Sequence, residues 1–562
     1  MHAIQKNAAS CPPPSSRRRA STYTLRLRAL IVTLGVGLAF AAVAAQLVRL
    51  SLRGEGAIAV TVSEPVAQSF ARPDIVDRNG RLLATDVEMP SLFADPALVL
   101  DRDEVAEKLL AVFPDLDTQE LARALSDRSR RFVWIRRGLP PKIAQQVHDL
   151  GLPGLAFRSE LRRAYPAGRL AGHVLGQVNI DNKGVAGIER HIDEAIGVEA
   201  VHGATLSGAA PVRLALDMGV EHGLEEELAG AMRRFEARGA AGLIMDVATG
   251  EVLAAASLPG VDPSRAGEAL DESRLDKVAG GTFELGSIWK AVTIAMALEG
   301  GKTTLDTIVD VTAPLAAGRF TITDLHPPGR PLTVAEVFLH SSNVGAGYLA
   351  LGAGAERLRA FLAKLGLTEP MRTELGPVAA PQLPERLERA EQITIAYGHG
   401  IAVAPVQFAA AAAALINGGE LVRPTFLKRQ PDTTVERVRV VSGETSAKIN
   451  ELLRRNVTDP AGTGRRAEVA GYRVGGKTGT AEIPGRGGYR KTAVISSFLA
   501  AFPMDAPKYL VLVSLFEPKG TNESRGETRA GTNAAPTAAR VIERIAPLLG
   551  VLPGGSVAAA GE

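Results

Sequence analysis

Apolar residues form one long unbroken stretch near the start of the chain. Residues 29–48 carry no charge, and Gln46 and the hydroxyl of Thr33 are their polar groups. In a helix rising about 1.5 Å per residue, a stretch of about twenty residues spans the hydrocarbon layer of a membrane, about 30 Å. The pattern predicts one transmembrane helix over 29–48. A signal peptide cleaved near Ala42-Val43-Ala44 is the alternative, but the long polar segment before the stretch favours an uncleaved anchor.

Residues 1–28 are polar and contain no acidic side chain. They carry Arg17–Arg19, Arg26 and Arg28. Such a composition is typical of disorder, and basic residues beside a membrane helix stay on the cytoplasmic side. We therefore expect a cytoplasmic tail over 1–28. The chain from residue 49 onward would then lie outside the cytoplasm.

Short segments typical of strands and of helices follow over residues 49–212. Residues 75–83 are typical of two strands joined by an Asn-Gly turn. Residues 103–113 and 118–125 have the spacing of short amphipathic helices. No nucleophile stands beside a base here, so the segment is predicted to be a mixed α+β support domain, a non-catalytic pedestal.

The pattern changes again over residues 213–550. Apolar strand-like runs occur early and late, with helical segments between them, which predicts an antiparallel sheet covered by helices. The fold class is therefore α+β, with a flexible tail over 551–562. The predicted strands are 240–246, 251–257, 472–474, 494–501 and 509–515, and the predicted outer helices are 220–238 and 534–549.

Composition narrows the function classes. The chain has 562 residues, a net charge of +3, and 46% hydrophobic residues. No basic stripe with aromatic residues occurs, so nucleic-acid binding is not expected. Cys11 is the only cysteine, which excludes an intramolecular disulfide and a cysteine-based zinc site. There is no H-E-x-x-H motif, and neither a metal nor a cofactor is expected.

Candidate chemistry begins at Gly286–Lys290, where a serine precedes a lysine by three positions. The apolar run 291–298 that follows is typical of a buried helix. Residues i and i+3 share a helix face, so Lys290 Nζ can reach Ser287 Oγ. The helix N-terminus would stabilise an anion there and disfavour a charged lysine. Alone, the motif is a weak signal, since most such pairs are solvated.

Two later motifs strengthen the signal. Ser341-Ser342-Asn343 and Lys477-Thr478-Gly479-Thr480 follow in that order. S-x-x-K, S-x-N and K-T-G, in this order, form the signature of class A β-lactamases and penicillin-binding proteins. The ordered triple predicts a serine acyltransferase that recognises penicillin.

The chemistry of acyl transfer suggests a role for each residue type. Ser287 would be the nucleophile and Lys290 its base, with a pKa lowered by burial and by Lys477. Ser341 could relay a proton to the leaving amine, and Asn343 could hold the substrate amide or Lys290.

The K-T-G segment would form the binding edge. Its glycines permit a peptide to dock as an added strand. Lys477 and the hydroxyls of Thr478 and Thr480 suit a terminal carboxylate, with Gly479 between them. The backbone N–H groups of Ser287 and Thr480 are the expected oxyanion donors.

The chain resembles the class B penicillin-binding proteins, and among them the division-specific septal peptidoglycan D,D-transpeptidases of Gram-negative bacteria. Beyond the three motifs, the resemblance rests on segments 72–80, 163–166, 173–181, 187–189 and 397–407. It implies D-Ala-D-Ala stem peptides as donors, an acyl-enzyme on Ser287, inhibition by β-lactams, and partnership with the septal glycosyltransferase and other division proteins. It also implies that the side on which the chain after residue 49 lies is the periplasm and that the anchor lies in the inner membrane.

Departures from the family pattern are modest. The family usually has Glu-Pro-Gly before the serine, and Thr-Phe between serine and lysine. Here Glu284-Leu285-Gly286 precede it, and Ile288-Trp289 follow. Ile288 and Trp289 are expected to pack into the domain, although Trp289 could instead form a pocket wall. His340 and His399 lie near motifs and are interpreted as structural.

Other functions remain open from sequence. An elongation-specific paralogue would share every motif. A β-lactamase or D,D-carboxypeptidase would need a base that positions water for deacylation, and no such base can be identified from the sequence. A receptor that binds penicillin without turnover would keep the same motif residues.

Overall fold

The computed structural model describes residues 17–52, 71–196, 210–318, 320–485 and 488–554. The chain divides into two compact units, Met1–Gln68 and Ser69–Glu562. Residues 1–16 of the expected tail and most of the expected C-terminal tail lie outside the described residues. The predicted boundary between residues 212 and 213 falls within the second unit and stays a prediction.

In the first unit, helix α1 (Arg17–Leu52) contains the whole predicted anchor. It begins within the segment expected to be disordered, so that expectation was wrong for residues 17–28. A search of the described residues finds no helix long and apolar enough to cross a membrane. The side chains of residues 29 and 47–48 lie outside the described part. The membrane anchor therefore stays a prediction.

The second unit begins with a five-stranded sheet of order β3-β2-β1-β5, with β4 paired to β2. The Asn-Gly hairpin predicted over 75–83 is confirmed, since β1 and β2 pair antiparallel. Helices α2 to α4 cover the β2–β3–β4 end through an apolar cluster. The strands are β1 (Ile75–Val76), β2 (Leu82–Ala94), β3 (Val133–Arg136), β4 (Leu155–Ala164) and β5 (Val212–Arg213), and the helices are α2 (Arg102–Val112), α3 (Thr118–Ser126), α4 (Pro141–Asp149), α5 (Gly172–Leu175) and α6 (Gly187–Ile196).

A buried charge cluster ties this region together. Arg163 donates from Nε to Glu189 Oε1 at 2.6 Å and from Nη1 to Asp86 Oδ1 at 3.2 Å. Arg72 donates from Nε to Glu189 Oε2 at 2.9 Å. The side chains of Arg163 and Glu189 are 0% exposed. Three of the segments that carried the family resemblance therefore meet around one carboxylate.

The C-terminal sheet has the order β16-β17-β18-β6-β7, and all its strands pair antiparallel, as predicted. The hairpin of β6 and β7 turns at Gly250, whose φ is +72°. The segment 472–474 was wrongly predicted as a strand, because β16 begins only at Gly475. The strands are β6 (Gly239–Asp246), β7 (Val252–Leu258), β16 (Gly475–Gly485), β17 (Gly488–Phe502) and β18 (Tyr509–Phe516).

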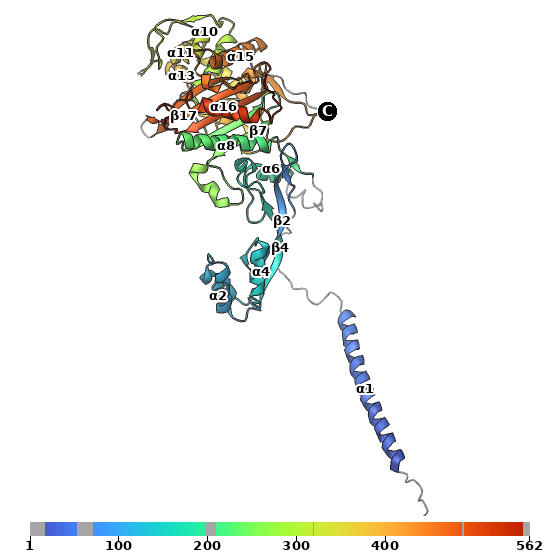
Figure 1. Cartoon of the computed structure of the whole chain (residues 1–562). Helices are drawn as coiled ribbons and strands as arrows, with labels where there is room; N and C mark the ends of the chain where they lie inside the picture. The colour runs from blue at the N-terminus through green and yellow to red at the C-terminus, as the bar shows by residue number, and fades with distance from the viewer. Residues whose placement is uncertain (1–16, 53–70, 197–209, 319, 486–487, 555–562) are drawn as a thin grey trace, which may run out of the picture. The chain divides into compact units, whose positions relative to one another are not determined.

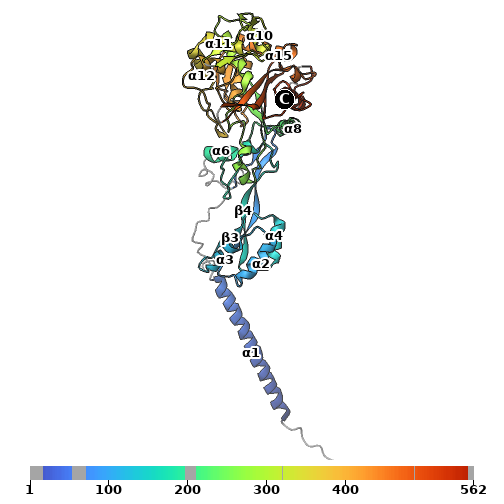
Figure 2. The same ribbon diagram turned by 90° about the vertical axis from the view of Figure 1, so that its left-hand side faces the viewer.

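Helices cover both faces of this sheet (Figures 1 and 2). Side chains alternate along a strand, so Val511 and Val513 of β18 pack with α8 and α16, whereas Leu510 and Leu512 pack into the larger core with α9 and α14. The helices are α8 (Met218–Arg234), α9 (Lys290–Leu298), α10 (Val334–Leu339), α11 (Asn343–Ala353), α12 (Ala355–Lys364), α13 (Arg389–Ile395), α14 (Pro405–Ile416), α15 (Gly443–Thr458) and α16 (Ala534–Ile545).

Short elements connect these layers. The strand pairs are β8 (Ile308–Val309) with β11 (Leu332–Thr333), β9 (Leu315–Ala317) with β10 (Phe320–Ile322), β12 (Arg372–Thr373) with β13 (Gly376–Pro377), and β14 (Glu420–Val422) with β15 (Arg437–Arg439). The 3-10 turns are η1 (Ala266–Leu270), η2 (Glu272–Arg274), η3 (Gly286–Trp289) and η4 (Arg465–Ala467).

Candidate active site

Ser287 lies in the 3-10 turn η3, directly before α9. The sequence predicted an α-helical first turn, but the tighter turn eclipses residues i and i+3. Gly286 has φ +60°, and a Cβ there would lie 2.6 Å from the carbonyl oxygen of Thr480. Glycine is therefore required for η3 to lie directly against β16, which brings two of the three motifs together.

Lys290 is the centre of the polar cluster. It is 0% exposed, and its Nζ donates to Ser287 Oγ at 2.7 Å. The same amine donates to Asn343 Oδ1 at 2.7 Å and to Ser341 Oγ at 3.2 Å. All three donor positions of an ammonium are thereby used, so the lysine is held against the serine without a carboxylate in direct contact.

Ser341 links the two lysines. Its Oγ accepts from Lys477 Nζ at 3.0 Å as well as from Lys290 Nζ. The residue has φ +57°, a left-handed conformation that is uncommon for serine. It lies between the end of α10 and the start of α11, and this backbone turn aims the hydroxyl at both amines. The sequence placed Ser341 at the site, but only the fold reveals the bridge.

Burial lowers the pKa of both lysines. Lys290 has a pKa well below its usual value, first because of burial and second because of the nearby Lys477 amine, whereas Asp324 opposes the shift. Burial lowers the pKa of Lys477 to about 7. A neutral amine beside a hydroxyl is what general-base activation of a serine requires.

The K-T-G segment lies on β16, an edge strand of the sheet. Lys477 and Gly479 face η3, and a Cβ on Gly479 would lie 2.3 Å from the carbonyl oxygen of Leu285. Thr478 and Thr480 share the opposite face because side chains alternate. Thr478 Oγ1 donates to Thr463 Oγ1 at 2.7 Å, and Thr480 Oγ1 accepts from the N–H of Ala530 at 3.1 Å.

Asp324 is a site residue that the sequence did not reveal. Its carboxylate accepts from Ser342 Oγ at 2.5 Å, from the Asn343 N–H at 2.5 Å and from the Val344 N–H at 3.1 Å. These bonds hold the first turn of α11, from which Asn343 reaches Lys290. No local pattern marks Asp324, because its partners lie 18 to 20 positions further along the chain.

A second group, whose contacts the sequence did not reveal, gathers at Glu284, three residues before Ser287. Tyr489 Oη donates to Glu284 Oε1 at 2.8 Å, and the N–H of Gly400 donates to the same oxygen at 3.0 Å. His399 Nδ1 lies 3.6 Å from Glu284 Oε2. Burial raises the pKa of Glu284 and lowers that of His399 to about 4. These contacts attach the β16–β17 hairpin to the segment that precedes Ser287.

Trp289 packs in the core, as the first interpretation of the sequence expected. It is 1% exposed and stacks on Phe408 with ring centroids 5.4 Å apart. His340 is exposed at the end of α10. Within the described part of the chain, no group of His, Cys, Asp and Glu side chains could hold a metal ion.

Both halves of the second unit match models of known protein families. A family model for the penicillin binding protein transpeptidase domain matches residues 240–543. A model for the penicillin-binding protein dimerisation domain matches residues 68–233.

Full-length relatives agree with these matches. The probable peptidoglycan D,D-transpeptidase FtsI of Caulobacter vibrioides is 40% identical over 488 residues, covering 86% of this chain and 82% of that protein. The probable peptidoglycan D,D-transpeptidase PenA of Neisseria meningitidis serogroup B is 32% identical over 469 residues, 80% of each chain. The peptidoglycan D,D-transpeptidase FtsI of Escherichia coli K12 is 28% identical over 512 residues, covering 86% and 85%.

Proposed function

Because this chain belongs to the penicillin-binding protein transpeptidase family, we propose that it is a peptidoglycan D,D-transpeptidase that cross-links stem peptides at the division septum. The observation that carries the chemistry is the chain of contacts from Ser287 through Lys290 and Ser341 to Lys477, with spacings of 2.7 to 3.2 Å. It joins all three motifs in one network around two buried lysines.

In the proposed first step, Ser287 Oγ attacks the carbonyl of the penultimate D-Ala while neutral Lys290 takes the hydroxyl proton. The new Oγ–C bond forms an ester, and the C–N bond to the terminal D-Ala breaks. The proton reaches the leaving amine by way of Ser341. In the second step an amine of a neighbouring stem attacks the ester, the C–N cross-link forms and the Oγ–C bond breaks, and the proton lost by the amine returns to Ser287 Oγ.

The binding roles follow from the same geometry. The donor stem would add as a strand beside β16, with its terminal carboxylate near Lys477, Thr478 and Thr480. The backbone N–H groups of Ser287 and Thr480 would stabilise the oxyanion. A β-lactam carries a reactive amide and a carboxylate at similar positions, and it would acylate Ser287 in the same way.

The setting of the enzyme is part of the proposal. We place the chain in the inner membrane through a single helix over 29–48, with the pedestal over 49–212 and the catalytic domain over 213–550 in the periplasm. The septal glycosyltransferase and other division proteins are the proposed partners. Depletion that produces filamentous cells would support the division role, whereas round cells would assign the chain to elongation.

Mass spectrometry after incubation with penicillin tests the activity directly. We expect one penicilloyl adduct on the peptide that contains Ser287 and none in Ser287→Ala. A stable adduct excludes a β-lactamase, and cross-linking of purified lipid-linked precursor excludes a receptor without turnover. An adduct that persists in Ser287→Ala would overturn the assigned nucleophile.

The acylation rate should depend on pH through Lys290. A base must be neutral to accept a proton, so the rate should rise with pH as Lys290 deprotonates and then level off. Because burial and Lys477 hold the pKa of Lys290 well below 10.5, the rising limb should lie well below that pH. The second-order rate constant for penicillin, measured from about pH 4 to about pH 10, checks this. A rate that rises only near 10.5 would contradict it.

Asp324 is expected to act as a positioning residue. Asp324→Ala should slow acylation about tenfold, because the Asn343 and Val344 N–H groups at the start of α11 lose their acceptor and Asn343 its fixed orientation. Asp324→Asn should move the rising limb to lower pH, since the carboxylate raises the pKa of Lys290. Asp310→Ala is the matched control, because Asp310 accepts similar bonds from Thr312 in an exposed turn. An unchanged rate and pH profile in both Asp324 variants would refute the role.

A further inference from the structure

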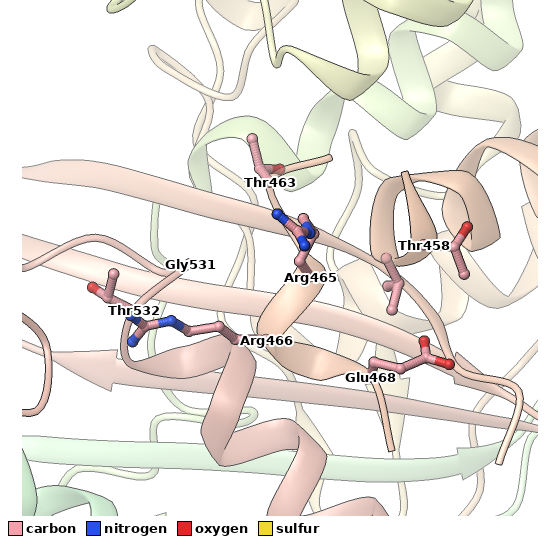
Figure 3. A pocket seen from close by; sticks show the side chains of 8 residues that line it. Thr458, Thr463, Arg465, Arg466, Glu468, Gly531 and Thr532 are labelled. Atoms are coloured by element: carbon pink, nitrogen blue, oxygen red, sulfur yellow. The ribbon is translucent and has the colours of Figure 1, made fainter. Parts of the chain in front are cut away.

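A cavity of about 710 Å³ adjoins the carboxylate-binding end of β16 (Figure 3). It lies between the end of α15, the turn η4 and the segment that precedes α16. Its polar lining includes Thr463, Arg465, Arg466 and Thr532. In Figure 3 the Arg466 side chain extends toward Thr532, while Arg465 lies below Thr463. None of these residues takes part in the chemistry described above.

The cavity carries uncompensated positive charge. Arg465 and Arg466 are exposed, and neither guanidinium has a hydrogen-bond or ion-pair partner among the described residues. Glu468, the acidic residue of the lining, is bound by both terminal nitrogens of Arg454, at 2.6 and 2.9 Å. Two free guanidiniums on one wall suit a carboxylate or a phosphate, which guanidinium binds in a bidentate manner.

The start of α16 does not supply the anion site. Asn533 Oδ1 accepts from the Ala534 N–H at 2.5 Å, and the Ala535 and Thr537 N–H groups donate to Ala530 and Asn533 carbonyls. The first-turn donors are therefore already used. The hydroxyls of the lining threonines are used as well, since Thr458, Thr463 and Thr532 donate to Arg454 O, Asn456 Oδ1 and Arg529 O. Recognition of an anion in the cavity therefore falls to the arginine side chains.

Two contacts connect the cavity to the substrate-binding strand. Thr463 of the lining accepts from Thr478 Oγ1 at 2.7 Å. Gly531 of the lining directly follows Ala530, whose N–H donates to Thr480 Oγ1 at 3.1 Å. Thr478 and Thr480 are the residues assigned above to the terminal carboxylate of the donor. The cavity is thus next to the place that the leaving D-Ala occupies.

The direction of the reaction then identifies the occupant. The donor stem lies along β16 on the acyl side of the ester. The acceptor amine must approach the ester carbon from where the leaving amine departed, since the reverse reaction retraces the same path. The acceptor chain therefore enters past Thr478, toward the arginines, and an acceptor stem bears at least its C-terminal carboxylate.

We propose that this cavity binds the acceptor stem peptide, with Arg465 and Arg466 holding a carboxylate of the acceptor while its amine attacks the acyl-enzyme on Ser287. This rests on the proposed transpeptidase function and adds to it the site of the second substrate. The arginines fix the acceptor and touch neither the ester nor the donor, so they set the acceptor KM and leave acylation unchanged.

The test separates the two half-reactions in the full-length chain. The Arg465→Ala/Arg466→Ala double variant is compared with wild type and with Arg233→Ala, which removes an exposed arginine of α8 that also lacks a partner among the described residues. Acylation of Ser287 by penicillin should stay within about twofold, because the donor side is untouched. With a D-Ala-D-Ala donor peptide and a stem tetrapeptide acceptor, the acceptor KM should rise about tenfold or more in the double variant alone.

Two further arms identify the anion. When the same acceptor is supplied as its C-terminal amide, its KM with wild type should be high. The KM of the amide should rise little further in the double variant. Arg465→Lys/Arg466→Lys should give an intermediate KM, because charge is kept and the bidentate geometry is lost. An unchanged KM, or an equal rise for acid and amide acceptors, would overturn the proposal.

Phosphate is the competing anion, as the pyrophosphate of a lipid-linked precursor. Inorganic pyrophosphate that inhibits wild type but not the double variant, without any change in the acceptor KM, would assign the arginines to phosphate and overturn the peptide assignment. If penicillin fails to acylate wild type at all, the proposed function fails. Normal acylation with an unchanged acceptor KM defeats only the cavity proposal.

Discussion

Lys290→Met is expected to lower the rate of acylation by penicillin at least about 10³-fold, which is the loss seen when a general base is removed from a serine nucleophile. The amine is the group within 2.7 Å of Ser287 Oγ that is able to accept its proton. Rapid mixing of fluorescent penicillin with purified protein at neutral pH measures the rate. Methionine keeps the apolar stem and the approximate volume, so the change isolates the amine.

The stability of the same variant should not fall. Lys290 is 0% exposed, and a buried amine without a carboxylate in contact costs free energy in the folded state. The thermal midpoint of Lys290→Met should therefore equal or exceed that of wild type. Lys302→Met, an exposed lysine beyond the end of α9, is the control and should change neither quantity. Retained acylation in Lys290→Met would show that another group acts as the base.

Glu189→Ala is expected to lower stability and leave acylation unchanged, the reverse of Lys290→Met. We expect a loss of about 3 to 5 kcal/mol in the free energy of unfolding. The substitution removes the carboxylate that accepts from both Arg72 and Arg163, at 2.9 and 2.6 Å, and leaves the two buried guanidiniums with Asp193 and Asp86 as their remaining acidic partners. Urea denaturation followed by circular dichroism measures the change. Below the unfolding transition, Ser287 should be acylated at the wild-type rate, because Glu189 contacts none of the three motifs.

An exposed acidic residue provides the comparison for this variant. Glu444 pairs with Lys448 at 2.7 Å on the surface of α15, and Glu444→Ala should cost at most about 0.5 kcal/mol. A loss below about 1 kcal/mol in Glu189→Ala would mean that water or a local rearrangement compensates the two guanidiniums. The buried cluster would then not be what holds the pedestal segments together.

The sequence by itself determined the local elements. The β6–β7 hairpin follows from two apolar runs around a Thr-Gly turn, and the antiparallel C-terminal sheet from strand-like runs at both ends of the domain. Ser287 and Lys290 could be paired because three positions separate them, and such a short spacing constrains geometry without the rest of the fold. Order and identity of the three motifs were also sufficient to indicate the family.

The tertiary structure alone decided how the distant parts meet. Ser341 Oγ lies between two lysine amines because η3, α11 and β16 pack together, and their spacing along the chain contains no information on that distance. The same packing buries Lys290 and Lys477 and lowers their pKa values.

The roles of residues without a local sequence signature were also decided only by the tertiary structure. Asp324 accepts hydrogen bonds at the start of α11, and Glu189 accepts hydrogen bonds from Arg72 and Arg163. These partners lie 18 to 117 positions away in the sequence. The local sequence pattern indicates which backbone conformation a segment prefers. Desolvation of side chains and hydrogen bonds between distant side chains arise only when the chain packs into its tertiary structure. The sequence therefore named the candidate reacting groups, and the fold set their distances, charge states and supports.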